Sequence, residues 1–144
     1  MTDHVPDDDQ FEHWLFDMDD ALSAFVGSLD RETAVALDFA PPSLEPLERT
    51  LLDRYTDVEA TRPSAEAAML DGAARYVGET FRKNLGGKWF IDFRDPLNAF
   101  FGLPQLAGLH GQTTQICPLT LVTASLDRRT GKFLRTIYNS HANA

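Results

Sequence analysis

The sequence predicts an α+β fold, in which a mostly helical domain carries a small antiparallel sheet of two to four strands packed on a central helix. Two adjoining segments carry this prediction. Residues 63–85 repeat small and apolar side chains at three- and four-residue spacing, which is typical of a helix face turned to a core. In residues 88–93, the strand period of two places Trp89, Ile91 and Phe93 on one apolar face. We expect the helix to cover that face.

The central helix has sequence signals at both of its ends. Pro63 and Ser64 suit its first turn. Arg82 and Lys83 complement the negative end of the helix dipole. Gly86 can then adopt the left-handed backbone conformation that closes a helix without a Cβ penalty. We therefore expect the helix to end at the double glycine, and the strand to begin directly after it.

Three further helices are expected before the central one. The first covers residues 10–29, is capped by Asp8 or Asp9, and keeps its apolar residues at helical spacing. The second is short and covers residues 30–37, and the prolines that follow break it. Ser43 is expected to cap the third. The buried side of this third helix carries Leu44, Leu47, Leu51, Leu52 and Tyr55.

The chain after the first strand predicts the rest of the sheet and a C-terminal helix. One or two strands within residues 106–116 are expected to pair back on the first strand. Pro118 starts a helix whose apolar spacing continues to Ile137, and Gly131 is the point at which this helix can break in two.

Length and composition predict one cytoplasmic domain. The 144 residues, 43% of them hydrophobic, suit a single globular domain over residues 9–141, between a disordered leader (residues 1–8) and a short tail (residues 142–144). No run approaches the ~20 apolar residues of a membrane span, and the acidic start lacks the pattern of a signal peptide. The single cysteine, Cys117, cannot form an internal disulfide, which agrees with a reducing compartment.

Charge is unevenly divided along the chain. Residues 1–61 contain 16 acidic and 3 basic residues, and residues 62–144 contain 6 and 10, so net charges of −13 and +4 give the −9 of the whole chain. The acidic half would repel a nucleic acid, and the basic half lacks the interleaved aromatics of a nucleic-acid surface, so no nucleic-acid partner is expected. An acidic surface favours steering toward a basic protein partner.

Several short motifs resemble those of an uncharacterised bacterial domain family. The segments that carry the resemblance are LDFAPPSLEPLE (residues 37–48), YVGE (76–79), NLGGKW (84–89), CPL (117–119) and LDR (126–128). They occur in the same order as the signatures of that family and cover about Ala36 to Arg129. The family brings no catalytic residues, and similar small acidic bacterial domains include immunity proteins that neutralise a partner toxin. The resemblance therefore implies a fold more than a function.

The first candidate site is the acidic cluster formed by Glu12, Asp17, Asp19 and Asp20, which lie off the apolar stripe of the first helix. Its functional interpretation is a partner or metal site. Its structural interpretation is a solvated acidic face, which we favour because neighbouring helical residues point in different directions.

The second candidate site is centred on Glu79, which lies near the buried side of the central helix. A buried carboxylate must be paired or have a raised pKa, and in the second case it could act as a general base beside Arg82 and a pocket lined by Trp89. We favour a structural ion pair with Lys83, or with Arg75 or Arg82 on adjacent turns.

Other residues offer weaker chemistry. Cys117 could act as a nucleophile with His110 as its base, but a small buried side chain before Pro118 is the preferred interpretation. Gly86 and Gly87 follow a helix instead of preceding one, so they form a helix end and not a phosphate loop. The scattered histidines form no metal motif, and neither a metal nor another cofactor is expected.

Three functional hypotheses follow from these patterns. The leading one is a non-enzymatic protein-binding module, such as a bacterial immunity or antitoxin protein that neutralises a basic toxin through the acidic N-terminal helices. The second is a small-molecule-binding or hydrolytic domain with its pocket near Glu79, Arg82 and Trp89. The third is a structural or oligomeric subunit whose interface is the apolar segment of residues 97–109.

Overall fold

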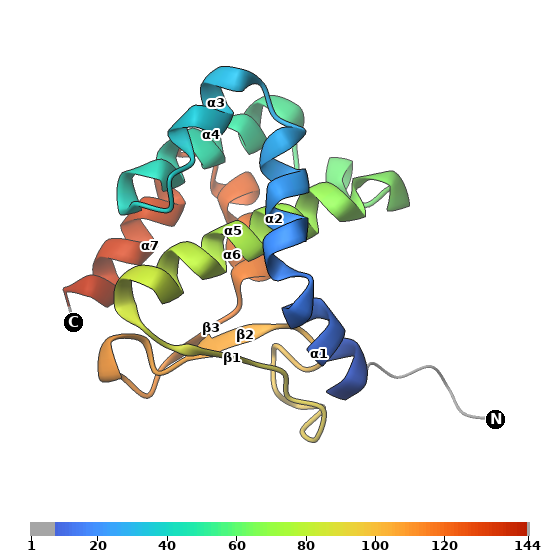
Figure 1. Cartoon of the computed structure of the whole chain (residues 1–144), viewed down its shortest axis with the longest axis vertical. Coiled ribbons are helices and arrows are strands. Elements are labelled where there is room, and N and C mark those ends of the chain that lie inside the picture. The colour runs from blue at the N-terminus through green and yellow to red at the C-terminus, as the bar shows by residue number, and fades with distance from the viewer. Residues whose placement is uncertain (1–7, 144) are drawn as a thin grey trace.

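The computed structural model, which describes residues 8–143, confirms a mostly helical α+β domain with a small antiparallel sheet (Figure 1). The helices are α1 (Asp8–Phe16), α2 (Met18–Gly27), α3 (Arg31–Ala36), α4 (Leu44–Arg54), α5 (Ala67–Leu85), α6 (Pro118–Arg128) and α7 (Phe133–Ala142). The strands are β1 (Lys88–Phe90), β2 (Gln105–Ala107) and β3 (Gln115–Ile116). Among the described residues, none of these helices combines the length and the apolar character that a membrane crossing requires.

Helix α5 is the centre of the molecule, as the sequence predicts. Every residue from Gly72 to Phe81 is buried, because α2 packs on this helix from one side and α6 from another. Small residues make these approaches possible: a Cβ atom on Gly72 would lie 2.4 Å from the ring of Phe25 on α2. Gly86 ends the helix with φ of +80°, and its N–H donates to the carbonyl of Arg82.

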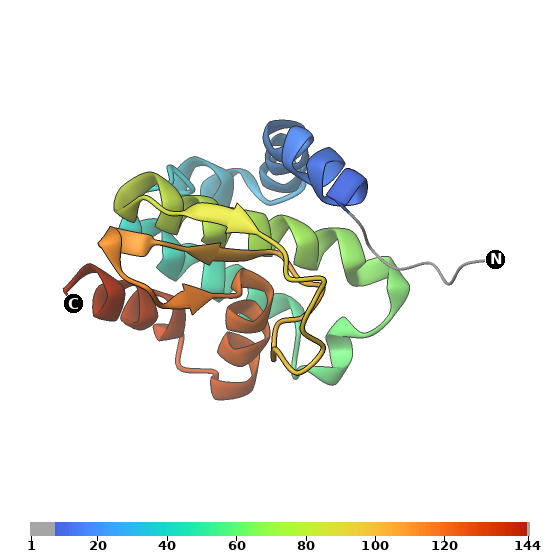
Figure 2. The same ribbon diagram turned by 90° about the horizontal axis from the view of Figure 1, so that it is seen from below.

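The sheet lies against α5 through one row of apolar side chains. Its strand order is β1-β2-β3, and Trp89, Leu106 and Ile116 lie opposite one another across the three strands. All three are buried. In Figure 2 helix α1 lies beyond the β1 edge, while α6 and α7 lie on the β3 side. The strand was predicted over residues 88–93, but β1 ends at Phe90. Its pairing with β2 stops there, because Phe90 lies opposite Gln105, the first residue of β2.

The single N-terminal helix predicted for residues 10–29 is wrong. The chain forms two helices, α1 and α2, which are separated at Asp17 (φ −81°, ψ 2°). The bend lets Trp14 of α1 reach Trp89 of β1, while α2 crosses α5 (Figure 1). Helix α1 begins at Asp8, so this residue is not part of a leader, and the other residues of the expected leader, 1–7, lie outside the described residues.

Ser43 does not cap α4 as predicted. It ends a short 3-10 helix (Pro41–Ser43) and has a helical backbone, so its hydroxyl does not reach the first amides of α4. The hydroxyl instead donates to the Ala40 carbonyl at 2.6 Å and shares a hydrogen bond of 2.7 Å with the Tyr76 hydroxyl. Ser43 therefore ties the segment before α4 to the central helix.

The C-terminal helix breaks near Gly131, where the sequence left either a break or a continuous helix open. Helix α6 ends with Arg129 in the left-handed conformation (φ 55°), and Gly131 has φ of +78°. Helix α7 then extends to Ala142, so the first residue of the expected tail is helical.

Candidate functional site

The outer face of α1 carries a fully exposed aromatic residue among acidic ones. Phe16 is 86% exposed, the largest exposure of any described aromatic side chain, and aromatic residues are enriched at the centres of protein interfaces. Phe16 lines a surface hollow together with Glu12 and His13, one helical turn before it, and Asp9, two turns before it. Helix α1 therefore presents an apolar group flanked by carboxylates to the solvent.

The four predicted acidic residues are all exposed, but they do not converge on one point. Asp17 lies at the bend between α1 and α2, and Glu12 lies on the face of Phe16. The hydrogen bond from Arg82 to Glu79 raises the pKa of the Arg82 guanidinium. The negative charge of Asp19 adds a weaker effect in the same direction. Within residues 8–143, no three His, Cys, Asp or Glu side chains are grouped as metal ligands, so the metal interpretation has no geometric support there.

The second candidate site does come together in space. Glu79, Arg82 and Trp89 line one hollow of about 300 Å³, with Leu15 and Met18 opposite them. Arg82 Nη2 donates to Glu79 Oε1 at 3.0 Å, Arg82 Nε donates to Glu79 Oε2, and Trp89 Nε1 donates to the same Oε2 at 3.2 Å. The ion pair therefore forms with Arg82, one of the three predicted partners, while Arg75 pairs with Asp71 instead.

The chemistry of Glu79 argues against a general base. Burial alone would raise the pKa of this carboxyl, but the hydrogen bonds from Arg82 and Trp89 outweigh burial, and the pKa lies below its usual value. A general base at neutral pH works best with a pKa near the working pH. Glu79 is instead a fixed anion whose two oxygens already accept hydrogen bonds.

The pKa of Glu79 is lower in the folded protein than in the unfolded chain, so the ionised side chain stabilises the fold. This stabilisation is fully present above the unfolded pKa of about 4.3 and is lost as the pH falls through the pKa of the folded protein. Glu79→Gln is expected to lower the free energy of unfolding by about 1–2 kcal/mol at pH 7, since Arg82 is partly exposed. Urea denaturation of both proteins should show a smaller difference at pH 3.5 than at pH 7. An equal loss at both pH values would show that the ionised pair is not responsible.

Sequence reasoning missed the polar network that fixes α1. Trp14 Nε1 donates to Asp71 Oδ1 at 2.8 Å, and Arg75 Nε donates to Asp71 Oδ2 at 2.7 Å. Arg75 is 4% exposed, lies 4.2 Å over the Trp14 ring, and also donates to the Trp14 carbonyl. The four-residue spacing of Asp71 and Arg75 indicates their ion pair, but no local signal indicates that both meet Trp14.

The remaining candidates have structural roles. Cys117 is 1% exposed and is followed by the first turn of α6, while His110 is exposed, which agrees with the preferred interpretation of Cys117 as a small buried side chain. Gly86 and Gly87 both have positive φ and follow the C-terminus of α5, so they form a helix end, although the ψ of Gly86, −156°, lies outside the predicted left-handed helical conformation.

The motif residues also serve the packing of the fold. Tyr76 stacks on Phe39 and accepts a hydrogen bond from its backbone N–H at 2.9 Å. Gly78 receives the ring of Trp89, and Glu79 accepts the hydrogen bond of its indole. The segments that carry the motifs therefore contact one another and assemble the core. Comparison with known protein families, curated proteins and solved structures finds no match to this chain.

Proposed function

We propose that the protein is a non-enzymatic binding module that docks a basic protein partner on an acidic face formed by Phe16, Asp9, Glu12, Asp17 and Asp20. The observation that carries the proposal is the exposure of Phe16, 86%, on a helix surrounded by carboxylates. Aromatic residues that fill a pocket of a partner supply much of the binding energy of protein interfaces. The flanking charges would set which partner is attracted.

The electrostatics of α1 and α2 support a cationic partner. Residues 8–30 contain seven Asp and Glu residues and no Lys or Arg. A surface of one sign accelerates the association of an oppositely charged protein and repels a nucleic acid, and salt weakens this effect. Helix α1 is also held on α5 by the network of Trp14, Asp71 and Arg75, which supports a face that is formed before a partner arrives.

The narrower form of this proposal is a bacterial immunity or antitoxin protein acting in the cytoplasm. Its support is the resemblance of the motifs to a bacterial domain family and the occurrence of immunity proteins among small acidic bacterial domains. A toxin that acts on nucleic acid or on an acidic substrate carries a basic surface, which this acidic face would cover.

Capture from native cell extract with the tagged protein tests the proposal. The expected result is one stoichiometric, basic protein that is retained at low salt, is released at high salt, and is identified by mass spectrometry. Recovery of no stoichiometric protein, or of one that binds equally to a variant lacking the acidic face, would contradict the proposal.

Charge reversal is expected to weaken this interaction. Asp17→Lys combined with Asp20→Lys should lower the affinity for the captured partner by about tenfold or more at low salt, and less at high salt. The matched control reverses Asp53 and Asp127, two exposed acidic residues on α4 and α6, and should have little effect. Equal losses from both pairs would mean that only the net charge matters.

A second candidate function, self-association, is favoured by the loop between β1 and β2. Leu97 is 93% exposed and Phe101 is 36% exposed on this loop. Asp92 holds the loop in place: its Oδ1 accepts the backbone N–H of Arg94 at 2.8 Å, and its Oδ2 accepts the Asn98 amide at 2.9 Å. These hydrogen bonds also lower the pKa of Asp92. The loop therefore presents an apolar side chain in a fixed conformation.

Light scattering tests self-association. If the loop is an interface, the protein should be a dimer or larger at working concentration, and Leu97→Asp should convert it to a monomer with an unchanged circular dichroism spectrum. A wild-type monomer at high concentration would contradict this candidate and leave the acidic face as the main surface.

A further inference from the structure

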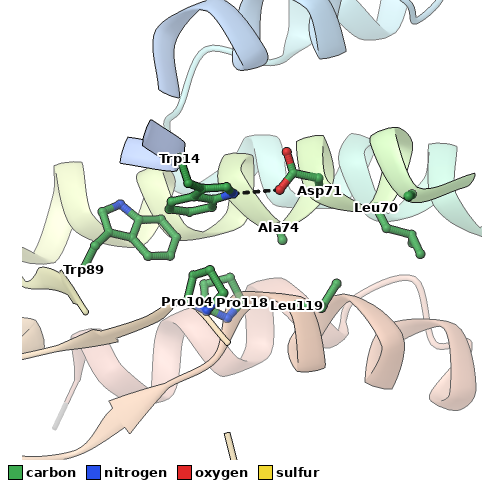
Figure 3. Close-up of a pocket in the computed structure, with 9 residues that line it drawn as sticks. Trp14, Leu70, Asp71, Ala74, Trp89, Pro104, Pro118 and Leu119 are labelled. Carbon is green, nitrogen blue, oxygen red and sulfur yellow. Dashed lines mark hydrogen bonds between the residues drawn. The ribbon is translucent and has the colours of Figure 1, made fainter. Parts of the chain in front are cut away.

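An apolar pocket of about 240 Å³ lies beside Trp89, between α1, α5 and the start of α6. In Figure 3 the Trp14 indole lies on one side of the pocket, and Pro104 and Pro118 lie on the other. Ala74 lies between them on α5, and Trp89 closes one end. The space is therefore bounded by flat or small apolar groups.

The pocket is held open by the surrounding structure. Trp14 cannot fold into it without breaking the hydrogen bond from its Nε1 to Asp71 and the contact with the Arg75 guanidinium. Trp89 is fixed in turn by its hydrogen bond to Glu79 and by its edge-on contact with Trp14, at 4.9 Å between ring centroids. A preformed pocket does not have to be ordered when a ligand binds.

We propose that this pocket binds a neutral aromatic molecule of one or two fused rings, about the size of indole. A dry apolar cavity of about 150 Å³ is known to accept benzene, so the larger volume here leaves room for a second ring. Trp14 and Trp89 offer a ring to stack on and a ring edge to contact, which favours an aromatic ligand over an aliphatic one.

The single charged residue among the described pocket-lining residues excludes anions. Asp71 lies at the rim, its side chain is 43% exposed, and its two oxygens already accept hydrogen bonds from Trp14 and Arg75. An anionic ligand would meet this carboxylate with no cation available to it, because Arg75 is already paired. The ligand is therefore not an anion, and because Arg75 already pairs with Asp71, the described residues of the rim offer no unpaired carboxylate to a cation either.

Nuclear magnetic resonance of the ¹⁵N-labelled protein tests the proposal with unlabelled indole as the probe. The chain has only two tryptophans, and both line the pocket, so its two indole N–H signals report on the site directly. Both signals should shift in a saturable manner, and Trp14→Phe assigns them. Indole-3-carboxylate should bind at least about tenfold more weakly. No saturable shift, or equal binding of the anion, would overturn the proposal.

Filling the pocket provides the matched test. Ala74→Leu should lower the affinity for indole by about tenfold or more, because the added side chain occupies the site. Ala67→Leu at the exposed rim serves the same purpose if the buried substitution prevents folding. Ala68→Leu, on the same helix but outside this pocket, should bind indole as the wild type does. Unchanged affinity in the folded filling variant would place the indole elsewhere and overturn the proposal.

Discussion

Gly78→Ala is expected to destabilise the protein by about 2–3 kcal/mol, although alanine favours a helix over glycine by about 1 kcal/mol. A Cβ atom at this position would lie 2.1 Å and 2.3 Å from Cη2 and Cζ2 of Trp89, and 3.1 Å from Cγ of Pro118. Trp89 is 8% exposed and is held by Glu79 and Trp14, so its ring cannot retreat without breaking those contacts.

Urea denaturation measures this loss, and Gly27→Ala is the control. A Cβ atom on Gly27, in the last turn of α2, would meet nothing within 4 Å, so that substitution should be neutral or stabilising by up to about 1 kcal/mol. If both substitutions had the same effect, the close contact between α5 and β1 would not be present.

Glu48→Ala is expected to cost about 3–4 kcal/mol, because this carboxylate of α4 caps another helix. Glu48 is fully buried, and its oxygens accept the backbone N–H of Leu134 at 2.8 Å and of Phe133 at 3.2 Å. Lys132, at the N-cap position of α7, makes no side-chain cap of its own. Removing the carboxylate leaves two amides without an acceptor and opens a cavity.

Two further substitutions provide the comparison for the stability loss of Glu48→Ala. Glu48→Gln retains one acceptor oxygen and should cost about half as much. Glu45→Ala, one turn away, removes only a partly exposed pair with Arg135 at 3.5 Å and should cost less than about 0.5 kcal/mol. Thermal or urea unfolding of the three variants should give that order, and a Glu48→Ala variant as stable as Glu45→Ala would contradict the capping role.

Local periodicity predicts the helices well because it records which side chains must be buried. It identifies α5, α3 and the buried leucines of α4, but of the predicted apolar face of Trp89, Ile91 and Phe93 only Trp89 lies in the strand and is buried. It does not identify the bend at Asp17, since the apolar spacing continues through the bend and neither glycine nor proline marks it. Trp14, three residues before the bend, contacts Trp89 and Asp71, which lie far from it in the sequence and leave no local signal.

Hydrogen bonds between segments that are far apart in the chain could not be predicted from the sequence. Glu48 and Leu134 are separated by 86 residues, and Trp14 and Asp71 by 57. A carboxylate that caps a distant helix looks the same in a sequence as one on the surface. The Glu79 pair was accessible because its partner Arg82 lies on the next turn of the same helix.

The sequence prediction of the acidic cluster named four charged residues. The binding face that we propose also includes Phe16, which that prediction did not name. Phe16 lies off the apolar stripe of Phe11, Trp14, Leu15 and Met18, so helical spacing places it on the solvent side, but the prediction named only charged residues there. We rest the proposed binding face on the exposure of Phe16, because an aromatic side chain can fill a pocket of a partner, whereas carboxylates alone are typical of any solvated surface.

The affinity of the captured partner for Phe16→Ala therefore tests the central claim most directly. Titration calorimetry should show a loss of about 10- to 30-fold relative to the wild type, with unchanged circular dichroism and unchanged thermal stability, because Phe16 contacts solvent in the free protein. An affinity equal to that of the wild type would contradict the claim that this face of α1 is the binding surface.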